Sequence, residues 1–353
     1  MANWEDWIRR TEPYVPGEQP RGDRLIKLNT NENPYPPAPG VQKALERMRA
    51  EDFRKYPDPE GSALKAALAG RYRLTPEQIF VGVGSDDVLA MAFLTFFNSS
   101  RPVLFPDITY SFYPVWAGLF RIPYETAPLD EQFCLRPEDY RRENGGIVFP
   151  NPNAPTGLCL PLEAVEDILR HNRDVVVIVD EAYIDFGGES AVRLLDRYEN
   201  LLVVQTFSKS RSMAGLRIGF AMGSPKLIRA LENVKFAYNS YTLNLPSLVL
   251  GTEAVKDEAY FQETTGRIVR TREKTAGRLR QLGFQFPDSR ANFLFITHEK
   301  ADAARLYEAL KEARIYVRYF PSGRLAPYLR MTIGTDEEME QVLAFLEDYL
   351  RRN

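Results

Sequence analysis

The stretch Gln205-Thr-Phe-Ser-Lys-Ser-Arg-Ser-Met-Ala-Gly-Leu-Arg-Ile-Gly219 joins two apolar runs, Leu201–Val204 and Ile218–Met222. Each run is short and uninterrupted, which is typical of a strand buried on both faces. The turn between them places Lys209 between two serines, eight residues before Arg217. A lysine there can form a Schiff base with an aldehyde cofactor, and a nearby arginine suits a phosphate group. An isolated Ser-Lys pair is also typical of a solvated lysine, so the rest of the chain must decide.

Seven apolar runs of this kind lie between residues 79 and 222, and helical patterns separate most of them. Strands that are apolar on both faces and alternate with helices indicate an α/β fold. We therefore expect a seven-stranded, mostly parallel sheet sandwiched by helices, in which the strand after Arg217 runs antiparallel. The expected strands are Ile79–Val83, Pro102–Phe105, Ile122–Thr126, Ile147–Phe149, Val175–Val179, Leu201–Val204 and Ile218–Met222.

The pattern changes near residue 250, where a long charged helical segment, Ser247–Leu282, precedes mixed strands and helices. This order indicates a smaller α+β domain. Its later elements are expected at Asn292–Ile296, Ala301–Glu312, Ile315–Tyr319, Leu329–Ile333 and Glu337–Arg351. The first residues are rich in proline and indicate an extended arm. We expect an N-terminal arm joining the small domain over 1–37, a large domain over 38–245 and the small C-terminal domain over 246–353.

Composition argues against several classes of protein. The 353 residues carry a net charge of −3, which gives no electrostatic reason to expect nucleic acid or an anionic membrane as a partner. The apolar segment Val88–Leu94 is far shorter than the ~20 residues of a membrane-spanning helix. Two cysteines and two histidines provide no cluster for a metal site and favour a reducing, cytoplasmic location.

The residues that follow the expected strands form a candidate phosphate site. Gly84-Ser85-Asp86 lies between the first strand and a helix, and a helix N-terminus offers free N–H groups to an anion. Ser208 offers a hydroxyl and Arg217 a guanidinium after a later strand. Because ligands of such sheets bind at the carboxyl ends of the strands, we expect these groups to meet there.

Other residues at the same strand ends suit an aromatic aldehyde ring. A carboxylate at Asp180 can keep a pyridine nitrogen protonated, and Lys209 can anchor the aldehyde. Tyr110 is a candidate for stacking on the ring. Tyr183, three residues after Asp180, can donate to a phenolic oxygen. Each residue alone has commoner structural roles, but together they predict pyridoxal 5′-phosphate as the cofactor.

Three motifs resemble those of the fold-type-I pyridoxal-phosphate aminotransferases: Asn151-Pro-Asn-Ala-Pro-Thr-Gly157, Asp180-Glu-Ala-Tyr183 and the stretch from Thr206 to Gly219. Further stretches resemble the histidinol-phosphate aminotransferases within that group. They are Tyr14–Gln19, Leu28–Pro37, Tyr56–Pro59, Gly84–Asp86, Asp107–Tyr113 and Leu329–Thr335. The resemblance covers nearly the whole chain and implies a pyridoxal-phosphate transferase fold of type I.

The resemblance implies an enzyme that transfers an amino group between L-histidinol phosphate and 2-oxoglutarate. The products would be imidazole-acetol phosphate and L-glutamate, formed by a ping-pong route in histidine biosynthesis. Lys209 would carry the Schiff base and shuttle the proton at the substrate Cα, with Asp180 and Tyr183 beside it. Ser85, Asp86, Ser208 and Arg217 would surround the cofactor phosphate.

The same resemblance implies the remaining binding residues. Arg330 would hold the acidic group of the amino donor or the 2-oxo acid, and Arg318 would assist it. Tyr14 and Asn29 would also contact the substrate. Tyr56 would reach the cofactor phosphate of a neighbouring subunit, so the active form would be a homodimer.

One position departs from the family pattern. The asparagine that usually precedes Pro155 and binds the phenolic oxygen is Ala154 here. Either Tyr183 would make that contact alone, or a water or the adjacent Asn153 would substitute. Substrate preference therefore stays open between histidinol phosphate and two other possibilities. These are an aromatic amino-acid aminotransferase and a threonine-phosphate decarboxylase. A non-catalytic pyridoxal-phosphate-binding regulator is the alternative of another class.

Overall fold

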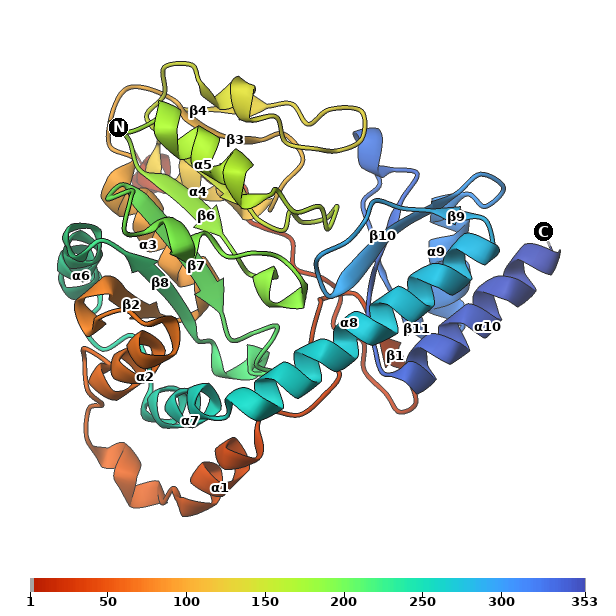
Figure 1. Ribbon diagram of the computed structural model, residues 1–353, viewed down its shortest axis with the longest axis horizontal. Helices are drawn as coiled ribbons and strands as arrows, with labels where there is room; N and C mark the ends of the chain where they lie inside the picture. Colours follow the sequence, from red (N-terminus) through yellow and green to blue (C-terminus); the bar gives the residue numbers. More distant parts are fainter. Residues whose placement is uncertain (1–2, 353) are drawn as a thin grey trace.

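The computed structural model describes residues 3–352, and a seven-stranded sheet forms its centre (Figure 1). The strand order is β2-β8-β7-β6-β5-β3-β4, and the strands from β3 to β7 run parallel. Strand β8 is antiparallel to both of its neighbours. The strands are β2 Ile79–Gly82, β3 Val103–Pro106, β4 Tyr124–Ala127, β5 Gly146–Pro150, β6 Val177–Asp180, β7 Leu201–Thr206 and β8 Gly219–Gly223. The predicted sheet is confirmed, including the antiparallel strand.

Helices cover both faces of this sheet. Alternate side chains of one strand enter different cores: Ile147 and Phe149 of β5 pack on one face, while Val148 packs on the other. The first core includes apolar residues of α1 Pro39–Arg47, α2 Ser62–Tyr72, α5 Leu162–His171 and α7 Leu245–Lys256. The second includes residues of α3 Gly84–Phe96, α4 Phe112–Phe120 and α6 Pro225–Tyr238. Two-sided burial explains the apolar character of the inner strands, whereas the edge strand β4 is mostly exposed and contains Glu125 and Thr126.

The C-terminal part contains a four-stranded antiparallel sheet in the order β12-β13-β10-β9. It packs with α8, α9 and α10 around a separate core. These elements are β9 Phe284–Gln285, β10 Phe293–His298, β12 Arg318–Tyr319, β13 Leu329–Thr332, α8 Glu258–Gln281, α9 Ala303–Glu312 and α10 Asp336–Arg352.

Two expected elements in this region are divided. The single helix predicted over 247–282 is two helices, because Asp257 ends α7 and caps α8 by accepting a hydrogen bond from the backbone N–H of Tyr260. The strand predicted over 315–319 is also interrupted. Its first half, β11 Ile315–Tyr316, pairs with the N-terminal strand, whereas the second half belongs to the four-stranded sheet.

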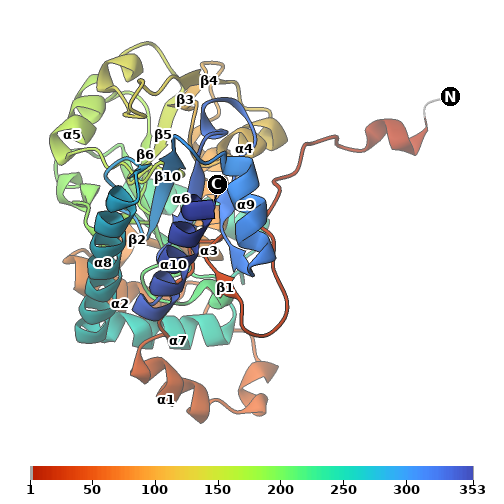
Figure 2. The same ribbon diagram turned by 90° about the vertical axis from the view of Figure 1, so that its right-hand side faces the viewer.

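The N-terminal segment crosses the molecule as an extended chain after its first residues. Strand β1 Ile26–Lys27 pairs in parallel with β11, and the backbone of Leu28 bonds to residues 316 and 332. The short helix Trp4–Trp7 instead projects away from the body (Figure 2), with Trp4 and Trp7 mostly exposed, and Arg9 then donates to the carbonyl oxygen of Leu119 in α4. The expected arm therefore lies on the body only over its later part.

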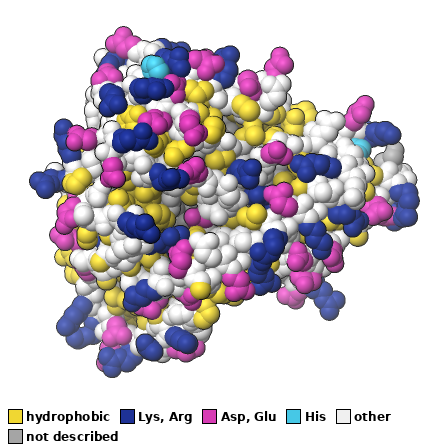
Figure 3. Space-filling model, in the orientation of Figure 1, with side chains coloured by type: hydrophobic (Ala, Val, Ile, Leu, Met, Phe, Trp, Pro, Cys, Tyr) yellow, Lys and Arg dark blue, Asp and Glu magenta, His cyan; other side chains and the backbone are white. Residues whose placement is uncertain are grey.

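The face seen in Figure 3 carries acidic and basic side chains interspersed over its surface. Among residues 3–352, no helix has both the length and the apolar character needed to cross a bilayer.

Candidate active site

A cavity of about 540 Å³ lies at the carboxyl ends of the central strands, the usual ligand position in sheets of this type. Part of the N-terminal segment closes one side of it. The predicted site residues that line it are Tyr14, Asn29, Ser85, Asp86, Tyr110, Asp180, Tyr183, Ser208, Lys209, Arg217, Arg318 and Arg330. Side chains from widely separated parts of the sequence therefore meet in one space.

Lys209 enters the cavity from the turn that follows β7. Its Nζ donates a hydrogen bond to the carbonyl oxygen of Thr30 at 2.8 Å. Burial and the nearby charge of Arg330 lower the pKa of the Lys209 amine from 10.5 to about 8. About a tenth of such amines are unprotonated at pH 7, compared with a negligible fraction of exposed lysines. The site therefore supplies a reactive amine near neutral pH.

Asp180 ends β6 and is only 4% exposed. Its Oδ2 accepts a hydrogen bond from the hydroxyl of Tyr113 at 2.9 Å, whereas Oδ1 is buried and has no hydrogen-bond partner among the described residues. Burial raises the pKa of the Asp180 carboxyl to about 7, although the bond from Tyr113 acts in the opposite direction. An unpaired carboxylate oxygen at the cavity wall favours a ligand with a cationic N–H group.

Tyr113 was not among the predicted site residues. It lies in the first turn of α4, three residues after Tyr110, and its side chain is fully buried. The sequence shows the Tyr-Ser-Phe-Tyr spacing, but only the start of the helix turns the second tyrosine towards Asp180.

Residues of the candidate phosphate site lie together near the start of α3. Arg217 donates to the hydroxyl of Ser208 at 3.2 Å and forms an ion pair with Asp86 at 3.1 Å. Asp86 also accepts a hydrogen bond from the Tyr110 hydroxyl at 2.7 Å. The first-turn N–H groups of α3 lack partners within the helix, so this corner combines free donors with a guanidinium.

Gly84 supports this corner without lining the cavity. Its φ of +84° is in the left-handed region, and a Cβ atom there would lie 2.5 Å from Nη2 of Arg217. A Cβ at Gly219 would lie 2.2 Å from the backbone carbon of Gly84. Both glycines are therefore required for the close approach of the two chain segments.

Two arginines of the C-terminal sheet also line the cavity. Arg318 and Arg330 are cross-strand partners in β12 and β13, and both line the cavity. Nη2 of Arg330 donates to the carbonyl oxygen of Asn29 at 2.9 Å, while its buried Nε has no partner in the described chain. Nη2 of Arg318 donates to Val15 O at 3.4 Å. Two adjacent guanidinium groups suit a phosphate or a carboxylate.

Aromatic rings of Tyr14, Tyr110 and Phe112 also line the cavity. Tyr14 stacks on Phe112 with ring centroids 4.1 Å apart, and its ring lies 6.4 Å from that of Tyr110. Burial raises the pKa of the Tyr110 hydroxyl, so this group stays protonated. Phe112 was not predicted as a site residue, although it belongs to the same motif as Tyr110.

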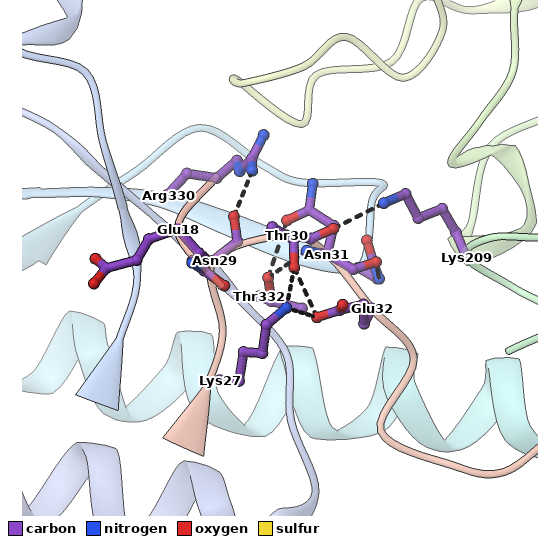
Figure 4. A network of polar contacts seen from close by, with 10 residues as sticks. Glu18, Lys27, Asn29, Thr30, Asn31, Glu32, Lys209, Arg330 and Thr332 are labelled. Atoms are coloured by element: carbon purple, nitrogen blue, oxygen red, sulfur yellow. Dashed lines mark hydrogen bonds and ion pairs between the residues drawn. The ribbon is translucent and has the colours of Figure 1, made fainter. Parts of the chain in front are cut away.

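Three consecutive residues of the N-terminal segment contact three of the predicted site residues, and Figure 4 shows two of these contacts in their polar network. The pairs are Asn29 O with Arg330 Nη2 at 2.9 Å, Thr30 O with Lys209 Nζ at 2.8 Å, and Asn31 Nδ2 with Tyr183 Oη at 2.9 Å. Thr30 and Asn31 were missed, because the motif over 28–37 carries no recognisable chemistry in the sequence.

Besides Gly84, two predicted site residues, Asn153 and Tyr56, lie outside the cavity. Asn153 donates from Nδ2 to the carbonyl oxygen of Ile108 and to the hydroxyl of Thr156, both at 3.1 Å. Its position therefore does not support the assignment to the cofactor, since its amide holds neighbouring loops together. Tyr56 is 81% exposed and stacks on Tyr241 with centroids 4.5 Å apart. It does not reach the cavity of its own chain.

Within residues 3–352, no group of three or more histidine, cysteine, aspartate or glutamate side chains has the arrangement of a metal site. Cys134 and Cys159 are both free thiols.

Comparison with protein families matches residues 23–346 to the family described as aminotransferase class I and II. Two relatives are named histidinol-phosphate aminotransferase. The protein from Pseudomonas putida (strain KT2440) is 54% identical over 343 residues, covering 96% of this chain and 97% of its own. The protein from Lactococcus lactis subsp. cremoris (strain MG1363) is 49% identical over 349 residues, covering 99% and 98%.

Solved structures share the fold at lower sequence identity. The histidinol-phosphate aminotransferase from Clostridium acetobutylicum has a TM-score of 0.86 at 21% identity and covers 93% of this chain and 100% of its own. The enzyme of that name from Sinorhizobium meliloti, in complex with pyridoxal-5′-phosphate, has a TM-score of 0.83 at 23% identity and covers 93% and 91%. These likenesses establish the transferase fold.

Proposed function

The chain belongs to the class I and II aminotransferases, and from this premise we propose that it transfers the amino group of L-histidinol phosphate to 2-oxoglutarate. The products are imidazole-acetol phosphate and L-glutamate, and the reaction belongs to histidine biosynthesis. The observation that carries the proposal is a single cavity lined by Lys209, by the residues of a candidate anion site and by an arginine pair. The near-full-length identity to relatives of that name supports the choice of substrate.

The family depends on pyridoxal 5′-phosphate, and the cavity fits this cofactor. The unpaired Oδ1 of Asp180 would accept a hydrogen bond from the protonated pyridine nitrogen. Arg217, Ser208 and the first turn of α3 would hold the phosphate. Lys209 would anchor the aldehyde. When bound, the protonated ring withdraws electrons from the substrate Cα–H bond.

Lys209 would move the proton that the reaction requires. With a pKa of about 8, its amine can accept the proton from Cα of the amino donor in the first half-reaction. In the second half-reaction the same group would return a proton to Cα of the new amino acid. The carbonyl oxygen of Thr30, 2.8 Å from Nζ, would hold the amine whenever it is free.

Arg330 and Arg318 would bind the acidic end of each substrate in turn. One substrate carries a phosphate and the other a carboxylate, and a guanidinium fork accepts both. The stacked rings of Tyr14 and Phe112 would exclude water from the space between this end and Lys209. Asn29, whose carbonyl oxygen accepts from Arg330, would fix the guanidinium rather than bind substrate through that atom.

Steady-state kinetics test the substrate assignment. We expect kcat/KM for histidinol phosphate, with 2-oxoglutarate as acceptor, to exceed that for phenylalanine by at least tenfold. A preference for phenylalanine would instead make the protein an aromatic amino-acid aminotransferase. Carbon dioxide release from threonine phosphate would make it a decarboxylase. Binding of the cofactor without turnover of any of these compounds would favour a regulator.

We also propose a homodimer in which Tyr56 contributes to the partner's cavity. The support is a surface where Phe53, Tyr56, Tyr238 and Tyr241 are 53%, 81%, 76% and 44% exposed, because large apolar patches mark interaction sites. Sedimentation equilibrium should give twice the chain mass. A monomer that retains full activity would contradict the proposal.

The free thiols of Cys134 and Cys159 support a cytoplasmic location, which fractionation of cells tests.

A further inference from the structure

Asn31 links Tyr183 to the C-terminal sheet. It is only 1% exposed, and its φ of +57° is in the left-handed region that asparagine tolerates. Its backbone carbonyl accepts a hydrogen bond from Nδ2 of Asn292 at 3.0 Å. Its backbone N–H donates to the hydroxyl oxygen of Thr332 at 3.1 Å. Figure 4 shows Asn31 and Thr332 within this network. The position of Asn31 is therefore fixed from the side opposite to Tyr183.

The two contacts with Thr332 determine which way the Asn31 amide faces. Since Thr332 Oγ1 already accepts the backbone N–H of Asn31, the hydroxyl proton is free to be donated. It is donated to Oδ1 of Asn31, 3.0 Å away. The amide oxygen thus faces Thr332, and the NH₂ group faces the hydroxyl of Tyr183 at 2.9 Å.

The direction of this last bond has a consequence for the cavity. The Tyr183 hydroxyl has one proton to donate and accepts an N–H from Asn31, so its own proton must point elsewhere. Tyr183 lines the cavity, and no other hydrogen-bond partner of its hydroxyl occurs among residues 3–352. The proton is therefore free to be donated into the cavity.

We propose that Asn31 is a positioning residue that makes Tyr183 a hydrogen-bond donor to an anionic oxygen in the cavity. The inference rests on the proposed function, because that oxygen is the phenolic oxygen of pyridoxal phosphate. Ala154 lines the same wall with only a methyl group, and the amide of Asn153 is turned away. Tyr183 thus offers a neutral side-chain donor beside Ala154, and its orientation depends on a residue 152 positions earlier in the chain.

Two uncharged substitutions test the proposal. Asn31→Gly removes the amide but retains a residue that adopts a φ of +57° without strain. Thr332→Val removes the hydroxyl that orients the amide while keeping the side-chain shape. The readout is the pH midpoint of the visible absorption of bound pyridoxal phosphate, measured without substrate. We expect both variants to raise it by about one unit, because an oxygen that loses a directed donor holds its proton more tightly.

Tyr183→Phe should raise the midpoint similarly, and adding Asn31→Gly to it should change little more, since Asn31 acts through the tyrosine hydroxyl. Asn172→Ala is the matched control for loss of a buried amide. Its Nδ2 donates to Tyr140 and Ile168 carbonyl oxygens away from the cavity, so stability should fall and the midpoint stay unchanged.

Unchanged midpoints in both uncharged variants would overturn the proposal. The proposal would also be overturned if Asn31→Gly shifted the midpoint of Tyr183→Phe by as much as it shifts that of the wild type. Because the measurement uses no substrate, failure of the histidinol-phosphate assignment would not affect it. A wild-type protein that binds no pyridoxal phosphate would instead refute the cofactor on which both proposals depend.

Discussion

Replacing Asp180 with asparagine should stabilise the cofactor-free protein, although it removes a proposed cofactor ligand. Burial raises the pKa of this carboxyl from 3.8 to about 7, so the folded chain binds its proton more tightly than the unfolded chain does. A carboxyl with a raised folded pKa contributes stability below pH 4 that is lost as pH rises to about 7. Asparagine carries no charge at any of these pH values and can still accept from the Tyr113 hydroxyl.

The size of the effect follows from the two pKa values. With about 1.4 kcal/mol for each pKa unit, ionisation of Asp180 destabilises the cofactor-free protein by roughly 2 kcal/mol at pH 5 and roughly 4 kcal/mol at pH 8. The free energy of unfolding of Asp180→Asn should therefore exceed that of the wild type by an amount that grows with pH. Urea denaturation of the cofactor-free proteins at both pH values measures this difference.

Bound pyridoxal phosphate should reverse the order of stability, so that the wild type becomes more stable than Asp180→Asn. A protonated ring nitrogen beside Oδ1 stabilises the ionised carboxylate, so the wild type gains more stability on binding than the variant does. Glu181→Gln is the matched control, since burial also raises the pKa of Glu181 to about 7 but its partners are Ser190, Ala191 and Gln205. The pH-dependent difference in unfolding free energy between Glu181→Gln and the wild type should persist when the cofactor is bound. In the cofactor-free proteins, the unfolding free energy of Asp180→Asn minus that of the wild type should grow with pH. A difference that stays constant or decreases between pH 5 and pH 8 would refute the reasoning.

Three further outcomes are expected. Lys209→Ala should lose multiple turnovers and the adduct that borohydride traps in the wild type, and sustained turnover would contradict its role. Arg330→Met should raise the pKa of Lys209 from about 8, because a neighbouring positive charge is removed, and pH-dependent amine labelling of the cofactor-free protein measures this shift. The same variant should raise KM for both substrates about 100-fold, which steady-state kinetics measure. Mixing inactive Lys209→Ala with a weakly active Tyr56→Ala protein should produce hybrid dimers that have one intact site. Activity no greater than the sum of the parents after subunit exchange would argue against a shared site.

The sequence by itself determined the sheet and the chemistry at its edge. Every strand of the central sheet except β4 is buried along its length, and polar residues follow several of them closely. Asp180 ends β6 and Lys209 follows β7, so their meeting depends only on parallel strands being neighbours. Such local relations can be predicted, because burial of the strand and the direction of its end place the next side chain.

Tertiary structure alone decided the contacts that cross between distant segments. Asn31 reaches Tyr183, and Thr30 reaches Lys209, only because β1 pairs with β11 and carries the N-terminal segment along the cavity. Asn153 is adjacent in sequence to the departure at Ala154, yet its amide bonds to Ile108 instead. A side-chain amide binds whichever donor or acceptor the packing brings within about 3 Å, and the sequence does not encode that distance locally.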